Sequence, residues 1–458
     1  MNFIEELRWR GMLHDMMPGT EAHLNREMTA GYIGFDPTAS SLHIGSLAAI
    51  MLLVHFQRAG HKPFALIGGA TGMIGDPSGK SAERDFLSEE TLRANQEGIR
   101  KQLERFLDFD CGENSAEIVN NYDWFREFSF LGFLREAGKH LTVNYMMAKD
   151  SVKKRLETGI SFTEFSYQLL QGYDFYWLYK NKGVRLQMGG SDQWGNITTG
   201  TELIRRKDPG GSLLDQTGAN QENGVGEDGT TGREPIEREP DYREAYALTT
   251  PLITKADGTK FGKSESGNVW LDPTMTSPFL FYQFWLNATD ADCPRQIRVF
   301  TLLSYHEIKE LERQHAETPH LRILQRAIAE DVTIRVHGQK GYELAVKASE
   351  VLFGKATLET LQAIEADEFA VIFDGVPQTE ITADELAGAK DITDLLSVVT
   401  QFEIYPSKGE ARRAIAQNAV SINKQKVSDP ATQVPTDWLQ GRYLVVSKGK
   451  KNHLIKKV

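Results

Sequence analysis

The chain has 458 residues, of which 40% are hydrophobic and 25% charged, with a formal net charge of -11 at pH 7. This length exceeds one ordinary domain and predicts two or three, with enough apolar residues to give each a core. No apolar run is long enough to cross a bilayer, and the first ten residues lack the apolar stretch of a signal peptide. We therefore expect no membrane partner and a cytoplasmic location.

Only two cysteines are present, Cys111 and Cys293, and they do not form a Cys-x-x-Cys pair. Neither a disulfide framework nor a cysteine zinc site is therefore expected.

The charge is unevenly distributed along the chain. Residues 407–458 contain eleven Lys or Arg against three Asp or Glu, a net +8, so the preceding residues carry -19. A basic terminal module attached to an acidic body is compatible with a nucleic-acid partner, which the overall charge would disfavour.

Over the first two hundred residues, short apolar runs alternate with helical patterns, which is typical of a parallel sheet flanked by helices. Strands are expected at 31–35, 63–67, 118–119 and 184–188, and helices at 162–179 and 191–206. The predicted class is α/β, with a Rossmann-like parallel-sheet catalytic domain. Ligands bind such sheets at the carboxyl ends of the strands.

Composition divides the chain further. A Rossmann-like domain is expected over 1–245, with a surface insertion at 208–244 that is rich in Gly, Glu, Asn and Thr. A helical domain is expected over 246–353, an acidic linker over 354–398, and a small α+β domain over 399–458.

A candidate nucleotide site follows the first strand, where residues 32–47 read Tyr-Ile-Gly-Phe-Asp-Pro-Thr-Ala-Ser-Ser-Leu-His-Ile-Gly-Ser-Leu. They predict a strand end, a turn and a helix that begins at Leu42 or His43. The free N-H groups of a helix start suit phosphates, and His43 would lie in the first turn. A lone histidine at such a place is more often a solvated surface residue.

Two segments together change that interpretation. His43-Ile44-Gly45-Ser46 resembles the His-Ile-Gly-His motif of class I aminoacyl-tRNA synthetases, with Ser in place of the second His. The segment 260–264, Lys-Phe-Gly-Lys-Ser, resembles their Lys-Met-Ser-Lys-Ser signature and differs at two central positions. The resemblance implies a flexible cationic loop that stabilises a departing pyrophosphate.

A glycine-rich segment, 68–81, follows the second predicted strand. Only three residues separate Gly75 and Gly79, so the segment is not a P-loop, and the nicotinamide fingerprint is absent. It resembles the glycine-rich segment of the tyrosyl-tRNA synthetases. That resemblance implies that Asp76 binds the amino group of tyrosine and that Lys80 and Arg84 reach the pyrophosphate.

The predicted helix at 162–179 carries a polar stripe. Tyr167, Gln171 and Asp174 fall at i, i+4 and i+7 and share one face, among apolar neighbours that argue against a solvated surface. The resemblance implies that Tyr167 and Gln171 bind the ammonium group, and that Asp174 and Tyr32 bind the phenol. Such a pair rejects phenylalanine, a discrimination for which a tyrosyl-tRNA synthetase is the standard example.

A double-glycine turn ends the strand at 184–188, and Ser191 or Asp192 is predicted as the N-cap of the next helix. The resemblance implies that Asp192 and Gly190 contact the ribose of ATP. It implies that Gln187 and Gln193 contact the α-carbon and carboxylate of tyrosine.

The resemblance also implies larger residue sets. ATP binding would involve Gly34, Asp36, Thr38, His43, Gly45, Ser46, Gly190, Asp192, Lys260, Phe261, Gly262, Lys263 and Ser264. Catalysis would rest on His43, Thr38, Lys80, Arg84, Lys260 and Lys263, which position the substrates and stabilise charge without a nucleophile. No protein metal ligand and no tightly bound cofactor are expected, since Mg²⁺ would arrive with ATP.

The terminal module reads as a basic helix followed by a hairpin and resembles the S4 RNA-binding domain. Its candidate tRNA-binding residues are Lys408, Arg412, Arg413, Lys424 and Lys426. A solubilising tail is disfavoured because apolar residues among them supply a small core. Such a surface binds phosphates with little sequence information.

The resemblance to tyrosyl-tRNA synthetases extends over essentially the whole chain. It implies that L-tyrosine and Mg-ATP give tyrosyl-adenylate and pyrophosphate, and that tyrosine then passes to the terminal adenosine of tRNA(Tyr). It also implies a homodimer. The alternatives are the tryptophanyl enzyme, against which Tyr32 and Asp174 argue, and a non-catalytic RNA-binding or splicing protein, against which His43 and Asp76 argue.

Overall fold

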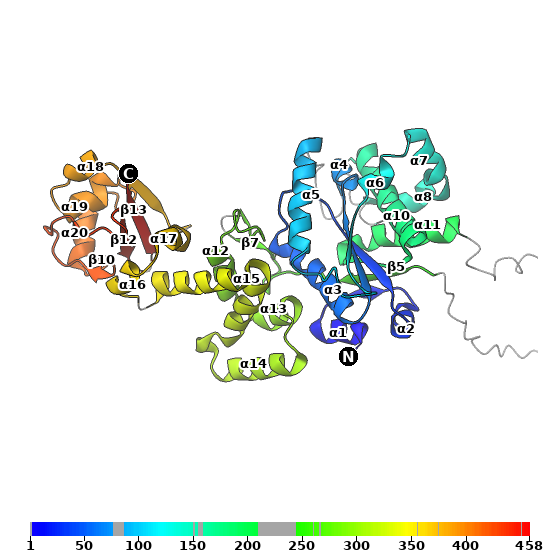
Figure 1. Cartoon of the computed structure of the whole chain (residues 1–458), viewed down its shortest axis with the longest axis horizontal. Helices are drawn as coiled ribbons and strands as arrows, with labels where there is room; N and C mark the ends of the chain where they lie inside the picture. Colours follow the sequence, from blue (N-terminus) through cyan, green and yellow to red (C-terminus); the bar gives the residue numbers. More distant parts are fainter. Residues whose placement is uncertain are drawn as a thin grey trace, which may run out of the picture. The chain divides into compact units, whose positions relative to one another are not determined.

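The computed structural model describes residues 2–76, 87–149, 152–153, 159–208, 244–259, 261–264, 267–354, 356–373, 375–449 and 451–458. The chain forms two compact units, each with its own sheet (Figure 1). The first comprises Met1–Trp270 and Asp290–Arg313, and the second comprises Leu271–Thr289 and Gln314–Val458. All of the predicted insertion except Asp208 and Glu244 lies outside the described residues.

The sheet of the first unit has six strands in the order β1-β6-β5-β2-β3-β4. The strands are β1 Asp15–Met16, β2 Ala30–Phe35, β3 Lys62–Ile67, β4 Glu117–Asn120, β5 Val184–Gly190 and β6 Tyr246–Thr250. Strands β2 to β6 are parallel, and only β1 pairs antiparallel. The predicted parallel sheet is confirmed, and each of the four predicted strands lies within one of these.

The predicted boundary at residue 245 differs from the structure. Strand β6 begins at Tyr246 and pairs in parallel with β5, with Tyr246 opposite Leu186. All five residues of β6 are buried, as is usual for a strand covered on both faces. The first sheet is therefore incomplete without residues that the composition assigned to the next domain.

Helices surround this sheet. They are α1 Phe3–Arg10, α2 Thr20–Arg26, η1 Ile44–Ser46, α3 Leu47–Arg58, α4 Thr71–Ile74, α5 Glu89–Leu103, α6 Tyr122–Phe125, α7 Phe130–Glu136, η2 Gly138–His140, α8 Val143–Met147, α10 Phe162–Lys182, η3 Ser191–Gln193, α11 Trp194–Lys207 and α13 Cys293–Phe300. Helix α10 begins at a Ser161 cap whose side chain accepts from Glu164 N, and ends at Gly183 with φ 67°. The polar stripe of this helix, Tyr167, Gln171 and Asp174, faces the carboxyl ends of the strands.

The second unit combines helices with a five-stranded sheet. Its helices are α12 Pro278–Leu286, η5 Pro319–Leu321, α15 Ile323–Phe353, α16 Leu358–Gln362, α17 Ala366–Ile372, α18 Ala383–Ala387, α19 Ile392–Asp394, the π-helix η6 Leu395–Val399 and α20 Lys408–Ala416. Helix α14, Tyr305–Glu317, begins in the first unit and ends in the second. The strands are β9 Gln378–Ile381, β10 Val420–Ile422, β11 Gln425–Lys426, β12 Tyr443–Lys448 and β13 Lys451–Lys457, in the order β11-β10-β12-β13-β9.

The segment 354–398, predicted as an acidic linker, is instead structured where it is described. Its strand β9 pairs in parallel with β13, with Gln378 opposite Leu454. Ile381, Ile392 and Leu395 are fully buried in one core with residues of α20 and β10. Acidic side chains such as Glu359, Glu380 and Glu385 are exposed, whereas the apolar residues between them are buried, which is why composition alone indicated a linker.

Among the described residues, no helix combines the length and apolar character that a membrane span requires.

Candidate active site

A cavity of about 360 Å³ opens where the carboxyl ends of β2, β5 and β6 meet. It brings together many of the residues singled out in the sequence. The cavity is lined by Tyr32, Gly34, Asp36, Thr38, Gly45, Ser46, Asp76, Tyr167, Gln171, Asp174, Gln187, Gly190, Asp192 and Gln193. Its place agrees with the edge at which parallel sheets bind ligands.

Tyr32 and Asp174 lie together in the lining, and neither is exposed to solvent. Burial raises the pKa of Asp174 well above its ordinary value, and burial followed by the charge of Asp174 raises the pKa of Tyr32. Among the described residues, the Tyr32 hydroxyl has no hydrogen-bond partner. A buried hydroxyl without a partner is costly, so this part of the cavity is suited to a polar group of a ligand.

Two residues that sequence reasoning missed hold Asp174 in place. Asn121 Nδ2 donates to Asp174 Oδ2 and Trp124 Nε1 donates to Asp174 Oδ1, each at 3.0 Å. Asn121 Nδ2 also donates to Thr71 Oγ1 at 3.0 Å, and Asn121 Oδ1 accepts from Ala70 N at 2.7 Å. Asn121 directly follows β4 and Trp124 lies in the short helix α6 after it, so their place just beyond a strand end was the signal that could have found them.

Asp36 organises the next part of the wall. Its Oδ2 accepts from the Tyr167 hydroxyl at 3.0 Å, and its Oδ1 accepts from Thr71 Oγ1 at 2.9 Å. A Cβ added at Gly68 would lie 2.2 Å from Asp36 Oδ1, so any other residue there would displace the Asp36 side chain. The first glycine of the glycine-rich segment therefore serves close packing against Asp36.

Another part of the cavity lining is rich in hydrogen-bond acceptors. Gln193 Nε2 donates to Asp76 Oδ2 at 2.7 Å. Burial and the charge of Asp76 raise the pKa of Asp192. Among the described residues, the buried Oε1 atoms of Gln171 and Gln187 have no partner. Carboxylates and unsatisfied carbonyl oxygens together suit a ligand that carries an ammonium group.

His43 differs from its predicted position in the first turn of a helix. It is the N-cap of the short η1, its Nδ1 accepts from Gly45 N at 2.9 Å, and α3 begins only at Leu47. The side chain satisfies one of the free N-H groups of this turn, so the first helical turn begins after His43, at Ile44. His43 is not among the lining residues of the cavity, whereas Gly45 and Ser46 are.

The described part of the signature loop lies against this turn. Phe261 is buried and its ring stacks on Phe300 with 5.1 Å between ring centroids. Gly262 has φ 93°, and a Cβ there would lie 3.1 Å from Gly45 N. Lys263–Ser264 forms β7 and pairs with β8, Gly267–Asn268. Lys80, Arg84 and Lys260 lie outside the described residues, as do the side chains of Lys263 and Ser264.

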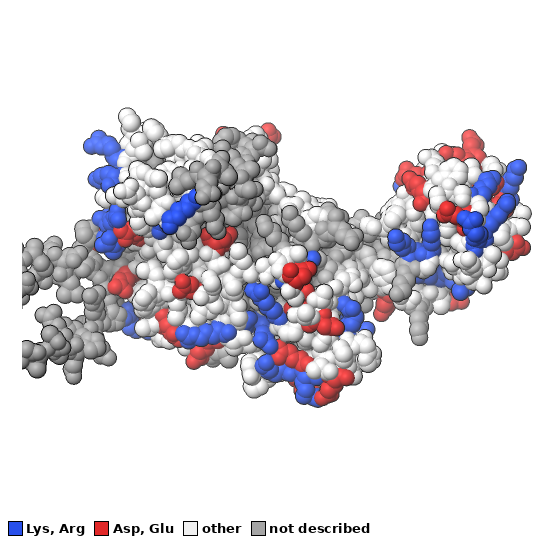
Figure 2. Space-filling view, turned by 180° about the vertical axis from the view of Figure 1, so that it is seen from behind, with Lys and Arg blue, Asp and Glu red and all other residues white. Residues whose placement is uncertain are grey.

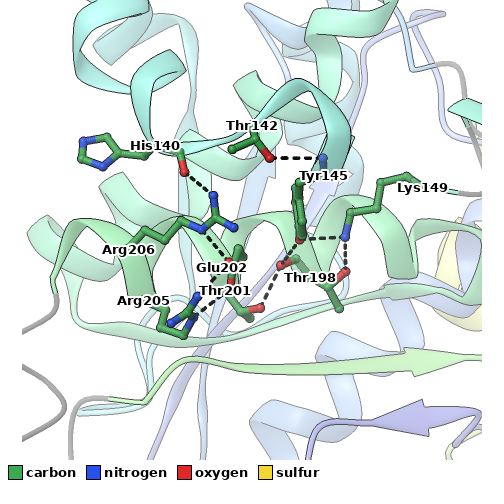
Figure 3. A network of polar contacts seen from close by, with 9 residues as sticks. All are labelled: His140, Thr142, Tyr145, Lys149, Thr198, Thr201, Glu202, Arg205 and Arg206. Carbon is green, nitrogen blue, oxygen red and sulfur yellow. Dashed lines mark hydrogen bonds and ion pairs between the residues drawn. The ribbon is translucent and has the colours of Figure 1, made fainter. Parts of the chain in front are cut away.

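A polar network fastens α11 to α8 (Figure 3). Lys149 Nζ donates to the Tyr145 hydroxyl at 2.7 Å and to Thr198 Oγ1 at 3.0 Å. Arg206 donates to the carbonyl of His140 at 2.8 Å. Burial lowers the pKa of Lys149 to about 8. Since α11 directly follows η3, which carries Asp192 and Gln193, the network helps to fix that side of the cavity.

The basic residues of the terminal module are not equivalent. Lys408 Nζ pairs with Asp394 Oδ1 at 2.5 Å, and burial lowers the pKa of Lys424 in the tight turn between β10 and β11. Arg412 and Arg413 are exposed on α20. Figure 2 shows Lys and Arg mixed with Asp and Glu on the visible face of this module. Arg412 and Arg413 are therefore the more available of the predicted phosphate-binding residues.

Within the described ranges, no group of three or more His, Cys, Asp or Glu side chains could hold a metal ion.

Comparison with known proteins identifies relatives for both parts of the chain. Residues 24–354 match the family model "tRNA synthetases class I (W and Y)", and residues 368–455 match "Tyrosine--tRNA ligase SYY-like C-terminal domain". The second match begins within the predicted linker, in agreement with β9 and its buried neighbours.

Two curated relatives are named "Tyrosine--tRNA ligase". The one from Cytophaga hutchinsonii is 60% identical over 454 residues, covering 99% of each chain. The one from Amoebophilus asiaticus is 58% identical and covers 100% of this chain and 99% of its own. Among solved structures, a C-terminally truncated mitochondrial tyrosyl-tRNA synthetase from Aspergillus nidulans superposes with a TM-score of 0.63 at 28% identity, covering 77% of this chain and 94% of its own.

Proposed function

This chain belongs to the tyrosine--tRNA ligases, class I synthetases that activate tyrosine with ATP and transfer it to tRNA, and we propose that the cavity at β2, β5 and β6 is its active site. Tyr32 and Asp174 bind the phenol of the substrate. The buried Tyr32 hydroxyl without a partner, beside a carboxylate that is already held by two donors, carries this assignment.

The rest of the cavity orients the amino-acid end of tyrosine. Asp76, Tyr167 and Gln171 bind the ammonium group, because they supply a carboxylate, a hydroxyl and an unsatisfied carbonyl oxygen. Gln187 and Gln193 lie beside the α-carbon and the carboxylate.

ATP binds, as its magnesium complex, along the glycine-rich edge of the same cavity. Gly190 and Asp192 contact its ribose, while Gly34, Asp36, Gly45 and Ser46 lie beside the nucleotide, and Thr38 and His43 lie beside its phosphates. The signature loop supplies Lys260, Phe261, Gly262, Lys263 and Ser264, and Lys80 and Arg84 act on the pyrophosphate. Charge stabilisation at the leaving group is the largest contribution that such cations can make.

The chemistry requires no protein nucleophile. An oxygen of the tyrosine carboxylate attacks the α-phosphorus in line, a new P-O bond forms, and pyrophosphate departs with the electrons of the broken bond. The terminal adenosine hydroxyl of tRNA(Tyr) then attacks the carbonyl carbon and displaces AMP. Positioning of the two reactants lowers the barrier in both steps.

The terminal module is the tRNA-binding part, with Lys408, Arg412 and Arg413 on α20 and Lys424 and Lys426 in the hairpin of β10 and β11. We infer that it begins at or before residue 368, where the match to the C-terminal family domain begins, because β9 and the α19 region also share its core. Because tRNA and ATP are the substrates of the protein, we propose that it acts in the cytoplasm.

ATP-pyrophosphate exchange with the purified protein, each amino acid in turn and no tRNA tests the activation step. Exchange with tyrosine alone is expected, and Tyr32→Phe should weaken the discrimination against phenylalanine. Exchange with tryptophan would move the chain to the sister enzyme. No exchange with any amino acid would leave the RNA-binding scaffold as the better account.

A homodimer is supported by exposed apolar side chains on one region of the first unit. Phe130 and Leu131 on α7, Val143 on α8 and Phe162 at the start of α10 are 67%, 70%, 61% and 68% exposed. Large exposed apolar side chains that gather on neighbouring elements are typical of protein interfaces.

The double variant Phe130→Glu, Leu131→Glu is expected to convert the dimer into a monomer, because burying two carboxylates at an interface is unfavourable. Light scattering coupled to gel filtration measures the mass. Met28→Glu, at another exposed apolar residue of the same unit, is the matched control and should leave the mass unchanged. A double variant of unaltered dimeric mass would place the interface elsewhere.

A further inference from the structure

Helix α13 and the base of the signature loop are in direct contact within the first unit. The loop base, residues 254–259, forms a tight turn in which Lys255 N donates to Thr259 O at 2.9 Å and Asp257 Oδ1 accepts from Thr259 N at 2.9 Å. A cavity of about 80 Å³ lies between this turn and α13. The turn is therefore held together by its own hydrogen bonds, and its position depends on its contacts with neighbouring elements.

One holding contact comes from the beginning of α13. Asp292 occupies the N-cap position, yet its side chain makes no cap hydrogen bond to its own helix. Its Oδ1 instead accepts from Ala256 N, in the loop base, at 2.7 Å. An Asp side chain at an N-cap ordinarily accepts from the backbone of its own helix, whereas this carboxylate binds the loop base.

A second contact comes from the other end of the same helix. Phe300, the last residue of α13, stacks on Phe261 with an interplanar angle of 16°. Both rings are buried. The beginning of α13 thus contacts the loop at Ala256, and the end of α13 contacts it at Phe261.

These contacts determine where the loop meets the nucleotide motif. Gly262 follows Phe261 and packs against Gly45 and Ile44. Val269 N donates to Gly262 O at 3.2 Å, and Ile44 N donates to Val269 O at 2.9 Å. Moving Phe261 would shift Gly262 and hence the backbone of Lys263 relative to the ATP-binding turn.

We propose that Asp292 and Phe300 are positioning residues for adenylate formation: α13 sets the signature loop in the arrangement that stabilises the departing pyrophosphate. This inference rests on the proposed role of the loop in the first step. Since pyrophosphate leaves only in that step, displacement of the loop should slow activation and spare the transfer to tRNA. A residue that merely maintained the fold would affect both steps.

The test uses the full-length enzyme and Asp292→Ala. The rate of tyrosyl-adenylate formation, measured in a single turnover, is expected to fall about tenfold, which corresponds to loss of one charge-assisted hydrogen bond. The dissociation constant of tyrosine should not change. Transfer from preformed enzyme-bound tyrosyl-adenylate to tRNA should also proceed at the wild-type rate.

Two further variants keep the test decisive. Asp292→Asn retains an oxygen acceptor for Ala256 N and should recover most of the rate, whereas Phe300→Leu should repeat the selective loss. Arg298→Gln is the matched control on the same helix, because Arg298 donates to Glu312 at 2.9 Å instead of to the loop. It should have wild-type rates.

Equal losses in both steps, a weaker affinity for tyrosine, or wild-type adenylate formation by Asp292→Ala would each overturn the inference. A wild-type protein that forms no adenylate would instead contradict the proposed function, so the two failures are distinguishable.

Discussion

Asp174→Asn is expected to lower kcat/KM for tyrosine activation by about a hundredfold to a thousandfold. The variant removes the carboxyl group that binds the phenol and places an amide against that hydroxyl. Asp174 is fully buried and held by Asn121 and Trp124, so its carboxyl group is fixed in place beside Tyr32. Pyrophosphate exchange at varied tyrosine concentrations measures the loss.

Phenylalanine provides the internal control for Asp174→Asn. It lacks the hydroxyl, so its weak activation should fall far less than that of tyrosine, and the ratio of the two kcat/KM values should shrink. Asn presents only one oxygen to the two donors Asn121 Nδ2 and Trp124 Nε1, so some loss of stability is also expected. A fall of the same size for both amino acids would show that the variant damages the site as a whole and that Asp174 does not recognise the phenol.

Local patterns predicted the strand ends and the helix face that form the cavity, whereas most of its individual residues were expected only from the resemblance to the synthetases. The strands at Ala30–Phe35, Lys62–Ile67 and Val184–Gly190 are short apolar runs that end in glycine-containing turns, and the residues at those ends line one cavity. The stripe of Tyr167, Gln171 and Asp174 follows from helical spacing alone. These features depend on a few consecutive residues, which is why the sequence reveals them.

Features that depend on distant partners were not predictable in this way. Asn121 and Trp124 matter because they bond a carboxylate about fifty positions later. Strand β9 is short and flanked by acidic residues, and it becomes a strand by pairing with β13 more than seventy residues later. Propensity and composition carry no information about such pairings.

The second large effect is expected on stability, from Arg10→Met. The Arg10 side chain is 2% exposed and donates to three carbonyls at or beyond the end of α13: those of Arg298 at 2.7 Å, Thr301 at 3.0 Å and Leu303 at 2.7 Å. The last carbonyls of a helix lack partners within it and favour a cation. Methionine would leave these acceptors without their donor and remove the ion pair with Glu6, so the free energy of unfolding should fall by about 3–5 kcal/mol. Urea-induced unfolding of the full chain measures the change.

Arg8→Met, in the same helix α1, is the control that distinguishes the effect of burial from the effect of short hydrogen bonds. Arg8 pairs with Glu21 through hydrogen bonds of 2.7 and 2.6 Å, as short as those of Arg10, but its side chain is 47% exposed. Because solvent screens an exposed pair and hydrates each partner after the other is removed, Arg8→Met should change stability little. Similar losses for the two variants would mean that the short contacts themselves, and not the burial of Arg10 against α13, stabilise this end of the first unit. A large loss at Arg10 alone would show that α13, which also contacts the signature loop, is held in place from the amino-terminal helix.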